Sequence, residues 1–393
     1  MRVGIDLRPL QTSTARRGVG TYARHLLAAL ARSRRPEDEL LGFVSASQPG
    51  PEIPEAHLQG LVKVPGPSRG ITFLDGWRLP SLLVREKIDV YHSLFYALPS
   101  RGAPGVKMVQ TVHDLTPVLL PEGFTRRQRM VFRTALRRSR SAHRVIAVSE
   151  NTRTDLMEWL ALPPEAVEVI PPGIDPVFFL PVSAQRLAEL RLTLALEGPY
   201  WVHSGGYDPI KNLPLVLKAL ARLRGEGMAH RLVITGEPGV HGAAFRREVE
   251  ALRLEGAVLQ VGWVSLQDLA VLYAGAEVMV YPSRYEGFGF PPLEAMACGT
   301  AVVATRAGSL SEVLGGVCPL VDPDDAEGLA GELRGLLADA DRRREVASRG
   351  RQRAAEFRWE VTADRTWDLY RRLVSEPVAV PVGAAMPPPG FAG

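Results

Sequence analysis

The sequence is poor in cysteine and contains no long apolar run. Cys298 and Cys318 are its two cysteines in 393 residues, too few for a disulfide framework. No segment approaches the roughly 18 continuous apolar residues of a membrane span. The opening Val3-Gly4-Ile5 resembles a strand, whereas a secretory leader would be basic and then apolar. We therefore expect a cytoplasmic protein that is neither secreted nor transmembrane.

A strong net charge is also lacking. The formal charge is +4 and the pI is near 9.2, with 46% hydrophobic and 23% charged residues, as in an ordinary soluble protein. The chain shows no recognised nucleic-acid motif and no aromatic residues interleaved with basic ones, so we expect no nucleic-acid partner. Its length exceeds what one hydrophobic core usually serves, which predicts two domains.

The positive charge is concentrated in one segment. Eight arginines face one glutamate between residues 121 and 144. Arg133, Arg137, Arg140 and Arg144 follow helical spacing, which predicts that they share one helix face. Such a face suits anionic lipid and predicts a peripheral contact with the inner membrane surface. The alternative is a solvated helix face in an arginine-rich protein.

Short apolar runs alternate with helix-length segments along the chain. Nearly continuous valine and isoleucine runs of this kind indicate parallel sheets covered on both faces. We expect an α/β protein of two Rossmann-like domains facing each other across a cleft, with ligands at the carboxyl ends of the strands. The predicted strands are residues 2–7, 88–93, 106–112, 144–148, 167–170, 200–203, 231–235, 258–261, 278–281, 301–304 and 319–321.

The domain boundary is placed by proline. Residues 171–181 are proline-rich and form the candidate linker, which predicts domains at 1–175 and 176–360. Spaced aromatic and apolar residues predict one last amphipathic helix at about 360–375. From residue 376 the periodicity disappears among proline, alanine and glycine, so the tail 376–393 is predicted to be disordered.

Residues 281–299 combine a strand end, a glycine loop, two carboxylates and a helix start. Pro291 suits the first turn of a helix that Gly299 would end. A helix N-terminus carries unpaired N–H groups and about half a positive charge, and Gly287 and Gly289 have no side chains to keep a phosphate away. The segment therefore predicts a diphosphate resting on backbone amides.

Glu286 and Glu294 flank this loop. Glu286 precedes the turn, and Glu294 is expected in the first helical turn, so they can face different parts of one ligand. Glu294 would accept hydrogen bonds from ribose hydroxyls, and Glu286 would face the group that the diphosphate carries. Alternatively, Glu294 only complements the helix dipole and Glu286 is a solvated loop charge.

The run from Glu286 to Glu294 resembles the E-x7-E signature of retaining glycosyltransferases of family 4, also called glycosyl transferases group 1. The resemblance extends over most of the chain and implies the two-domain GT-B fold, with an N-terminal acceptor-binding domain and a C-terminal domain for the nucleotide sugar. It also implies that the last helix crosses back to the first domain. The other segments that carry it are residues 17–22, 111–115, 145–150, 171–175, 205–213 and 307–312.

The resemblance assigns roles to individual residues. It implies that Lys211 and the amides of Phe288 and Gly289 stabilise a departing diphosphate, as a metal ion would otherwise do. It implies that His113 contacts the donor sugar and stabilises its developing positive charge. Glycine-rich loops at Gly18 and Gly20, at Gly206 and at Gly287 would also bind the donor. Many relatives carry arginine where this chain has Gly206, a phosphate ligand that Arg284 would then have to replace.

No metal or cofactor is expected. No histidine and cysteine cluster has zinc spacing. Asp322-Pro-Asp324 is a D-x-D pattern, which holds a divalent ion in some sugar transferases. Its proline and the following Asp325 favour a turn leading into a helix.

The sequence thus predicts a retaining hexosyltransferase acting between a nucleotide diphosphate sugar and a hydroxyl acceptor. Resemblance to bacterial mannosyltransferases favours mannose and a GDP-linked donor, with a UDP-linked donor as the alternative. A lipid-linked glycan or a surface polysaccharide is the expected acceptor. Two other functions stay open at this point: a sugar-nucleotide epimerase or phosphorylase of the same fold, and a noncatalytic partner subunit.

Overall fold

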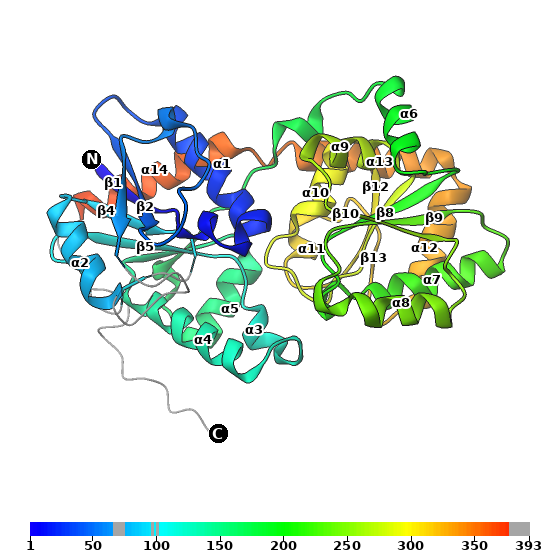
Figure 1. Ribbon diagram of the computed structural model, residues 1–393, viewed down its shortest axis with the longest axis horizontal. Coiled ribbons are helices and arrows are strands. Elements are labelled where there is room, and N and C mark those ends of the chain that lie inside the picture. Colours follow the sequence, from blue (N-terminus) through cyan, green and yellow to red (C-terminus); the bar gives the residue numbers. More distant parts are fainter. Residues whose placement is uncertain (66–74, 96–97, 100–101, 377–393) are drawn as a thin grey trace. The chain divides into compact units, whose positions relative to one another are not determined.

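The computed structural model describes residues 1–65, 75–95, 98–99 and 102–376. The chain divides into two compact units, one formed by Met1–Gly173 with the segment from Arg358 onward, the other by Ile174–Phe357 (Figure 1). Each unit is a parallel sheet with helices on both faces, so the predicted fold class of two parallel-sheet α/β domains is confirmed. Most of the tail that was predicted to be disordered lies outside the described residues.

The first unit contains a seven-stranded parallel sheet in the order β3-β2-β1-β4-β5-β6-β7. Its strands are β1 (Arg2–Asp6), β2 (Glu39–Ser45), β3 (Gly60–Val64), β4 (Val90–Ser93), β5 (Lys107–Val112), β6 (Arg144–Ala147) and β7 (Val167–Val169). Two of them, β2 and β3, were missed from the sequence. In β2 leucine and glycine replace the expected β-branched run, and in β3 exposed and buried residues alternate.

Helices cover both faces of this sheet. On one face lie α1 (Gly18–Ser33) and α14 (Trp359–Ser375), which pack against each other (Figure 1). On the other face lie α2 (Asp75–Arg85), α4 (Arg126–Arg137) and α5 (Glu150–Leu160), with the short α3 (Thr116–Leu119) before α4.

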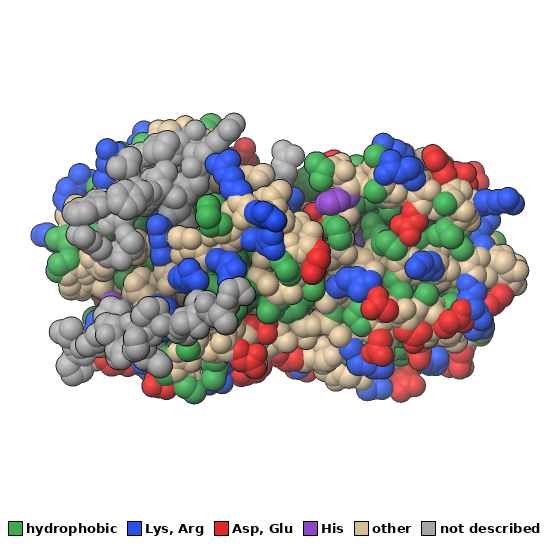
Figure 2. Space-filling model, turned by 90° about the horizontal axis from the view of Figure 1, so that it is seen from below, with side chains coloured by type: hydrophobic (Ala, Val, Ile, Leu, Met, Phe, Trp, Pro, Cys, Tyr) green, Lys and Arg blue, Asp and Glu red, His purple; other side chains and the backbone are tan. Residues whose placement is uncertain are grey.

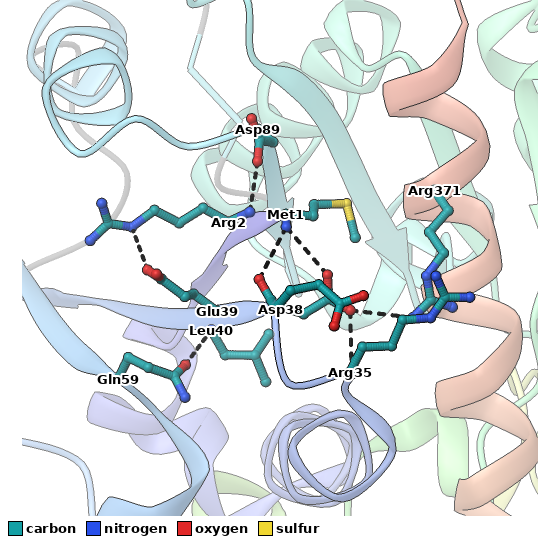
Figure 3. Close-up of polar contacts among 10 residues, drawn as sticks. Met1, Arg2, Arg35, Asp38, Glu39, Leu40, Gln59, Asp89 and Arg371 are labelled. Carbon is teal, nitrogen blue, oxygen red and sulfur yellow. Dashed lines mark hydrogen bonds and ion pairs between the residues drawn. The ribbon is translucent and has the colours of Figure 1, made fainter.

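Helix α14 is joined to the first half of the chain by buried polar contacts. The Trp367 indole donates to the carbonyl of Leu30 at 3.2 Å. Asp38, only 5% exposed, pairs with Arg371 at 3.3 Å and with the Met1 amine at 3.3 Å, and Arg35 donates its backbone N–H to the same carboxylate (Figure 3). The helix is therefore an integral part of the first unit.

The second unit contains a six-stranded parallel sheet in the order β10-β9-β8-β11-β12-β13. Its strands are β8 (Tyr200–Ser204), β9 (Arg231–Thr235), β10 (Val258–Gly262), β11 (Val278–Tyr281), β12 (Ala301–Thr305) and β13 (Leu320–Val321). Its helices are α6 (Ala184–Thr193), α7 (Leu213–Gly225), α8 (Gly242–Ala251), α9 (Leu266–Gly275), α10 (Phe290–Ala297), α11 (Leu310–Val313), α12 (Ala326–Ala338) and α13 (Ala340–Ala354).

The strand order fixes where each unit can bind a ligand. The order reverses between β1 and β4 in the first sheet and between β8 and β11 in the second. In open α/β sheets the loops leaving two such strands diverge to opposite faces and form a crevice at their carboxyl ends. In the second unit, the residues that follow β8 and β11 therefore lie at such a crevice.

The prediction that Arg133, Arg137, Arg140 and Arg144 share one helix face is wrong. Helix α4 ends at Arg137, a 3-10 turn occupies Arg138–Ser141, and Arg144 already begins β6. Arg133 and Arg137 are exposed on α4, whereas Arg140 and Arg144 belong to other elements and are partly buried. Among the described residues, no helix is both long and apolar enough to cross a bilayer.

Candidate active site

A lysine and a glutamate meet where the second sheet reverses its strand order. Lys211 follows β8 through the 3-10 turn Pro209–Lys211, and Glu286 follows β11. The Lys211 ammonium lies 2.6 Å from Oε1 of Glu286. The same oxygen accepts hydrogen bonds from the Tyr281 hydroxyl at 2.9 Å and from the Ser283 hydroxyl at 2.6 Å. The structure therefore brings together two of the predicted site residues and adds two hydroxyls to them.

The environment keeps this lysine charged. Burial alone would lower the pKa of Lys211, but the Glu286 carboxylate and the Tyr281 hydroxyl outweigh burial, and the pKa of the lysine is raised. Burial and the Glu286 charge raise the pKa of Tyr281, so its hydroxyl stays neutral and donates. Lys211 thus places a fixed positive charge at the carboxyl ends of β8 and β11, directly beside the Glu286 carboxylate.

Close backbone approaches build the loops around the pair. A Cβ on Gly236 would lie 2.3 Å from the Gly205 carbonyl, and a Cβ on Gly308 would lie 2.4 Å from the Glu286 carbonyl. Ser309 donates its N–H to Glu286 O at 2.9 Å and its hydroxyl to the Phe288 carbonyl at 3.0 Å. These contacts fix the loop from Glu286 to Gly289 against the loop that follows β12.

The loop ends at the N-terminus of α10. Gly289 caps the helix with a φ of +95°, which favours glycine, and neither a capping side chain nor an acidic residue occupies the first turn. Pro291 and Pro292 of the first turn carry no N–H, so the amides that this end can offer an anion are those of Phe288, Gly289 and Phe290. Gly287 and Phe288 are buried beside them.

Glu294 lies in the second turn of α10, not in the first turn as predicted. Its carboxyl is 8% exposed and accepts a long hydrogen bond from Tyr273 at 3.4 Å. Burial raises the pKa of Glu294 to about 8. The hydrogen bond from Tyr273 lowers this pKa by a smaller amount, and the Asp175 charge raises it slightly further. Its polar partner in the described part of the chain is Tyr273, so the structure does not join it to the Lys211 and Glu286 pair.

Several residues of this site were missed from the sequence. Tyr281 and Ser283 were taken only as a strand end, and His203 was not considered. The His203 ring stacks on the Tyr281 ring, with 6.0 Å between the ring centroids, and its Nδ1 bonds to the Val280 carbonyl at 3.1 Å. Burial lowers the pKa of His203 to about 4, so the ring is neutral at pH 7. Asn212 donates to the carbonyls of Pro282 and Pro323, at 3.1 and 2.7 Å, and so ties the loops together. Its position directly after Lys211 was the available signal.

Gly206 and Arg284 lie near the pair without forming a second cation site. Gly206 follows the turn at Gly205, whose added Cβ would meet the Lys211 side chain at 3.6 Å. Arg284, expected to replace a missing arginine at Gly206, pairs instead with Asp324 at 2.6 Å. Asp324 belongs to the predicted turn, in which the N–H of Asp325 donates a hydrogen bond to the Asp322 carbonyl at 3.0 Å. This turn leads into α12.

Gly18 and Gly20 lie inside helix α1, and the prediction of a glycine-rich turn before the helix is wrong. Two 3-10 turns, Arg8–Gln11 and Ser13–Arg16, lead from β1 to the helix, which begins at Gly18. A Cβ on Gly20 would lie 2.1 Å from the Ala15 carbonyl, so this glycine lets the second turn pack on the helix. The first turn of α1 has neither an acidic residue nor a capping side chain.

His113 follows β5 in the first unit. Its Nε2 bonds to the Leu94 carbonyl at 2.9 Å, and burial lowers its pKa against the opposing effects of this bond and Asp114. The neutral ring therefore donates from Nε2 and leaves Nδ1 as an acceptor. The Tyr22 ring lies edge-on at 4.8 Å. Its hydroxyl starts a buried chain that continues through Thr111, His92 and Tyr370 of α14.

Two α/β units, with a cation and a free helix N-terminus at the second sheet's reversal, define a class of enzymes that bind phosphorylated ligands at strand ends. Residues 16–178 match the family described as Glycosyltransferase Family 4, and residues 198–339 match Glycosyl transferases group 1. The chain is 30% identical to O-antigen chain mannosyltransferase B of Escherichia coli over 372 residues. The aligned residues cover 91% of this chain and 96% of that protein. The chain belongs to glycosyltransferase family 4 and is a glycosyltransferase.

A further relative and two solved structures are also similar to this chain. D-inositol 3-phosphate glycosyltransferase of Pseudarthrobacter chlorophenolicus is 30% identical over 398 residues, covering 93% of this chain and 94% of that protein. Sucrose-phosphate synthase from Thermosynechococcus elongatus superposes with a TM-score of 0.77 at 24% identity, covering 95% of this chain and 99% of that one. Anabaena HepE in complex with UDP and glucose superposes with a TM-score of 0.75 at 20% identity, covering 95% of this chain and 100% of that one. The structural likenesses show the fold alone.

Proposed function

We propose that the protein is a retaining glycosyltransferase that moves mannose from GDP-mannose to a hydroxyl of a lipid-linked glycan or a surface polysaccharide. The observation that carries the proposal is the Lys211 and Glu286 pair, 2.6 Å apart, at the strand reversal of the second unit. We place the enzyme in the cytoplasm, and such an acceptor would bring it to the inner face of the membrane.

The relatives support a mannosyl donor. O-antigen chain mannosyltransferase B and a further relative, the MMP alpha-(1->4)-mannosyltransferase of Mycolicibacterium hassiacum, are both mannosyltransferases by name. The HepE structures contain UDP or UDP-glucose, so a UDP-linked hexose is the alternative donor. We therefore rank GDP-mannose before UDP-glucose.

The proposed step breaks the bond between the anomeric carbon and the β-phosphate oxygen, which keeps the bonding electron pair. Lys211 and the amides of Phe288 and Gly289 stabilise that negative charge without a metal ion. The acceptor oxygen bonds to the anomeric carbon on the leaving-group face, and its proton passes to the departing phosphate. Glu286 orients the sugar hydroxyls, and Glu294 accepts from the ribose.

His113, through its ring or its backbone carbonyl, is proposed to stabilise the positive charge that develops on the sugar. Its pKa is lowered by burial, so the ring adds no positive charge of its own to this step at neutral pH. The helix N-terminus at Gly18 and Gly20 would contribute further amides to the diphosphate.

A thermal-shift screen with GDP, UDP, ADP and TDP tests the donor, each with and without EDTA. A ligand at 100 times its dissociation constant stabilises a protein by about 2.7 kcal/mol. We expect the largest shift with GDP and no loss of it in EDTA. A shift with UDP alone would change the donor, and loss of the shift in EDTA would contradict a metal-free site.

A transfer assay then tests the reaction itself. Radiolabelled GDP-mannose is incubated with a lipid-linked oligosaccharide fraction, and we expect labelled glycolipid with the donor's anomeric configuration. Consumption of donor without acceptor to give an isomeric sugar nucleotide would indicate an epimerase, and a requirement for inorganic phosphate would indicate a phosphorylase. Binding of GDP without turnover of any donor would indicate a noncatalytic subunit.

A further inference from the structure

Helix α4 carries a continuous exposed face that the transfer reaction does not use. Ala135 and Leu136 are buried in the core of the first unit, and Phe132 packs against that core. On the opposite side Met130 is 63% exposed and Val131 is 57% exposed. We call this side the α4 face; its exposed residues are Arg126, Arg127, Met130, Val131, Arg133, Thr134 and Arg137.

Ion pairs do not explain three of the arginines of the α4 face. Among the described residues, Arg126, Arg127 and Arg133 have no acidic partner, and Arg133 lies over the Trp159 ring at 5.9 Å. Exposed arginines elsewhere in the chain are commonly paired, as Arg334 is with Glu226 at 2.6 Å. The α4 face thus presents uncompensated positive charge to the solvent.

Helix stability does not explain them either. Thr125 and Gln128 form a capping box that satisfies the helix N-terminus. Arg126 and Arg127 nevertheless place positive charge in the first turn, at the positive end of the helix dipole, and no acidic residue balances it there. These side chains oppose the dipole, which points to a role for them outside the helix.

The apolar pair at the centre of the face indicates what kind of partner it meets. Met130 and Val131 lie next to each other on the helix, with Arg126 and Arg127 one turn before them and Arg133 and Arg137 after them. A helix that lies in a membrane interface has this composition, with apolar side chains that enter the boundary and arginines that meet the headgroups. A surface that binds nucleic-acid phosphates needs the arginines and not the exposed methionine and valine between them.

We propose that the α4 face docks the enzyme on an anionic lipid bilayer. Lys and Arg side chains gather on the underside of the first unit in Figure 2, the side on which Figure 1 draws α4. The α4 face differs from the membrane contact predicted from the sequence, which included Arg140 and Arg144. It lies on one helix and presents arginines and exposed apolar side chains together. The proposal does not depend on the identity of the sugar or of its acceptor.

Vesicle co-sedimentation tests the proposal with the full-length protein. Vesicles of phosphatidylcholine alone are compared with vesicles containing 30% phosphatidylglycerol. We expect binding to the anionic vesicles that weakens as salt is raised, because exposed charges are screened over about 10 Å at 0.1 M ionic strength. Equal binding to both kinds of vesicle, or binding to neither, would overturn the proposal.

Three variants separate the α4 face from net charge. Replacing Arg126, Arg127 and Arg133 together by Gln should lower partitioning about 100-fold. The control, Arg246, Arg247 and Arg253 to Gln, removes the same charge from exposed positions of the second unit and should change binding less than threefold. The double variant Met130→Ser and Val131→Ser should lower binding about tenfold at unchanged charge.

The melting temperature of each variant is measured, so that only folded proteins are compared. Equal losses in the α4 variant and the charge control would overturn the proposal in favour of non-specific attraction. A short RNA or DNA duplex is tested in parallel. Loss of duplex binding in the α4 variant, with vesicle binding unchanged, would also overturn it and identify a nucleic-acid surface.

Discussion

At the scale of single residues, the Lys211 and Glu286 pair controls the site. Replacing Glu286 by Gln removes the charge that faces Lys211 but keeps the shape of the side chain. We expect the rate of transfer to fall at least about 100-fold, since a lost preorganised electrostatic contact commonly costs that much. Nucleotide affinity, measured by calorimetry, should change less than fivefold.

Ser283→Ala is the matched control, because it removes one of the hydrogen bonds to Oε1 and leaves the carboxylate in place. It should retain at least about a tenth of the activity, since one neutral hydrogen bond contributes about 1 kcal/mol. Full activity of the Glu286→Gln variant would refute the assigned role.

Glu294 makes stability and nucleotide binding depend on pH. Its folded pKa of about 8 lies above its ordinary value of 4.5, so the folded state binds more protons between these values. The free energy of unfolding should therefore fall by up to about 1.4 kcal/mol per pH unit as the pH rises through this window. Glu294→Gln should flatten this dependence in urea titrations at pH 5 to 8.

The same carboxyl should release a proton when nucleotide binds, because ribose hydroxyls that donate to it favour its charged form. Calorimetry of GDP binding at pH 7 in buffers of different ionisation enthalpy would detect this. A buffer-independent binding enthalpy would show that Glu294 does not meet the nucleotide in this way.

At the scale of elements, the attachment of α14 rests on a buried ion pair. Asp38 is 5% exposed and pairs with Arg371 of α14. Replacing Asp38 by Ala leaves the partner charges without their carboxylate, which costs about 3–5 kcal/mol in buried pairs. We expect a melting temperature lower by several degrees, measured by circular dichroism.

Glu360→Ala provides the comparison, because the Arg32 and Glu360 pair also joins α14 to the first half of the chain, with both side chains about 60% exposed. An exposed pair contributes about 0–1 kcal/mol, so this variant should melt close to the parent protein. Equal effects of the two substitutions would contradict the importance of burial.

The elements also show how far the sequence could predict the structure. Strands such as β11 and β12 are continuous apolar runs and were predicted from composition, whereas β2 contains glycine and leucine and was missed. The helix at 126–137 was extended too far, because the chain turns at Arg138–Ser141 to enter β6. Such a turn follows from the position of the next strand, which local spacing does not record.

The site was predicted in its parts and not in its connections. Lys211 and Glu286 were each found from the family resemblance, 75 residues apart in the chain. Their bond, and the hydroxyls of Tyr281 and Ser283 that complete it, depend on β8 and β11 being neighbours in the sheet. Strand order is a property of the folded sheet, so this geometry had to come from the structure.

At the scale of the whole molecule, the second unit is one continuous segment inserted into the first. The chain leaves the first unit at Gly173, where an added Cβ would lie 2.2 Å from the Trp359 nitrogen, and returns at Arg358. The first unit therefore needs α14, which buries Trp367 and Tyr370 and bonds His92 at 2.5 Å. A chain ending at residue 357 should lose the fold of its first unit.

The second unit has its own sheet and core, and in the proposed function it holds the nucleotide. We expect a fragment of residues 174–357 to fold alone and to bind GDP within about tenfold of the affinity of the full chain, since Lys211, α10 and Glu294 are retained and only the amides at Gly18 and Gly20 are lost. Calorimetry on both proteins measures this. A folded fragment that does not bind GDP would show that residues of the first unit, with Gly18, Gly20 and His113 as the candidates, are needed to hold the nucleotide.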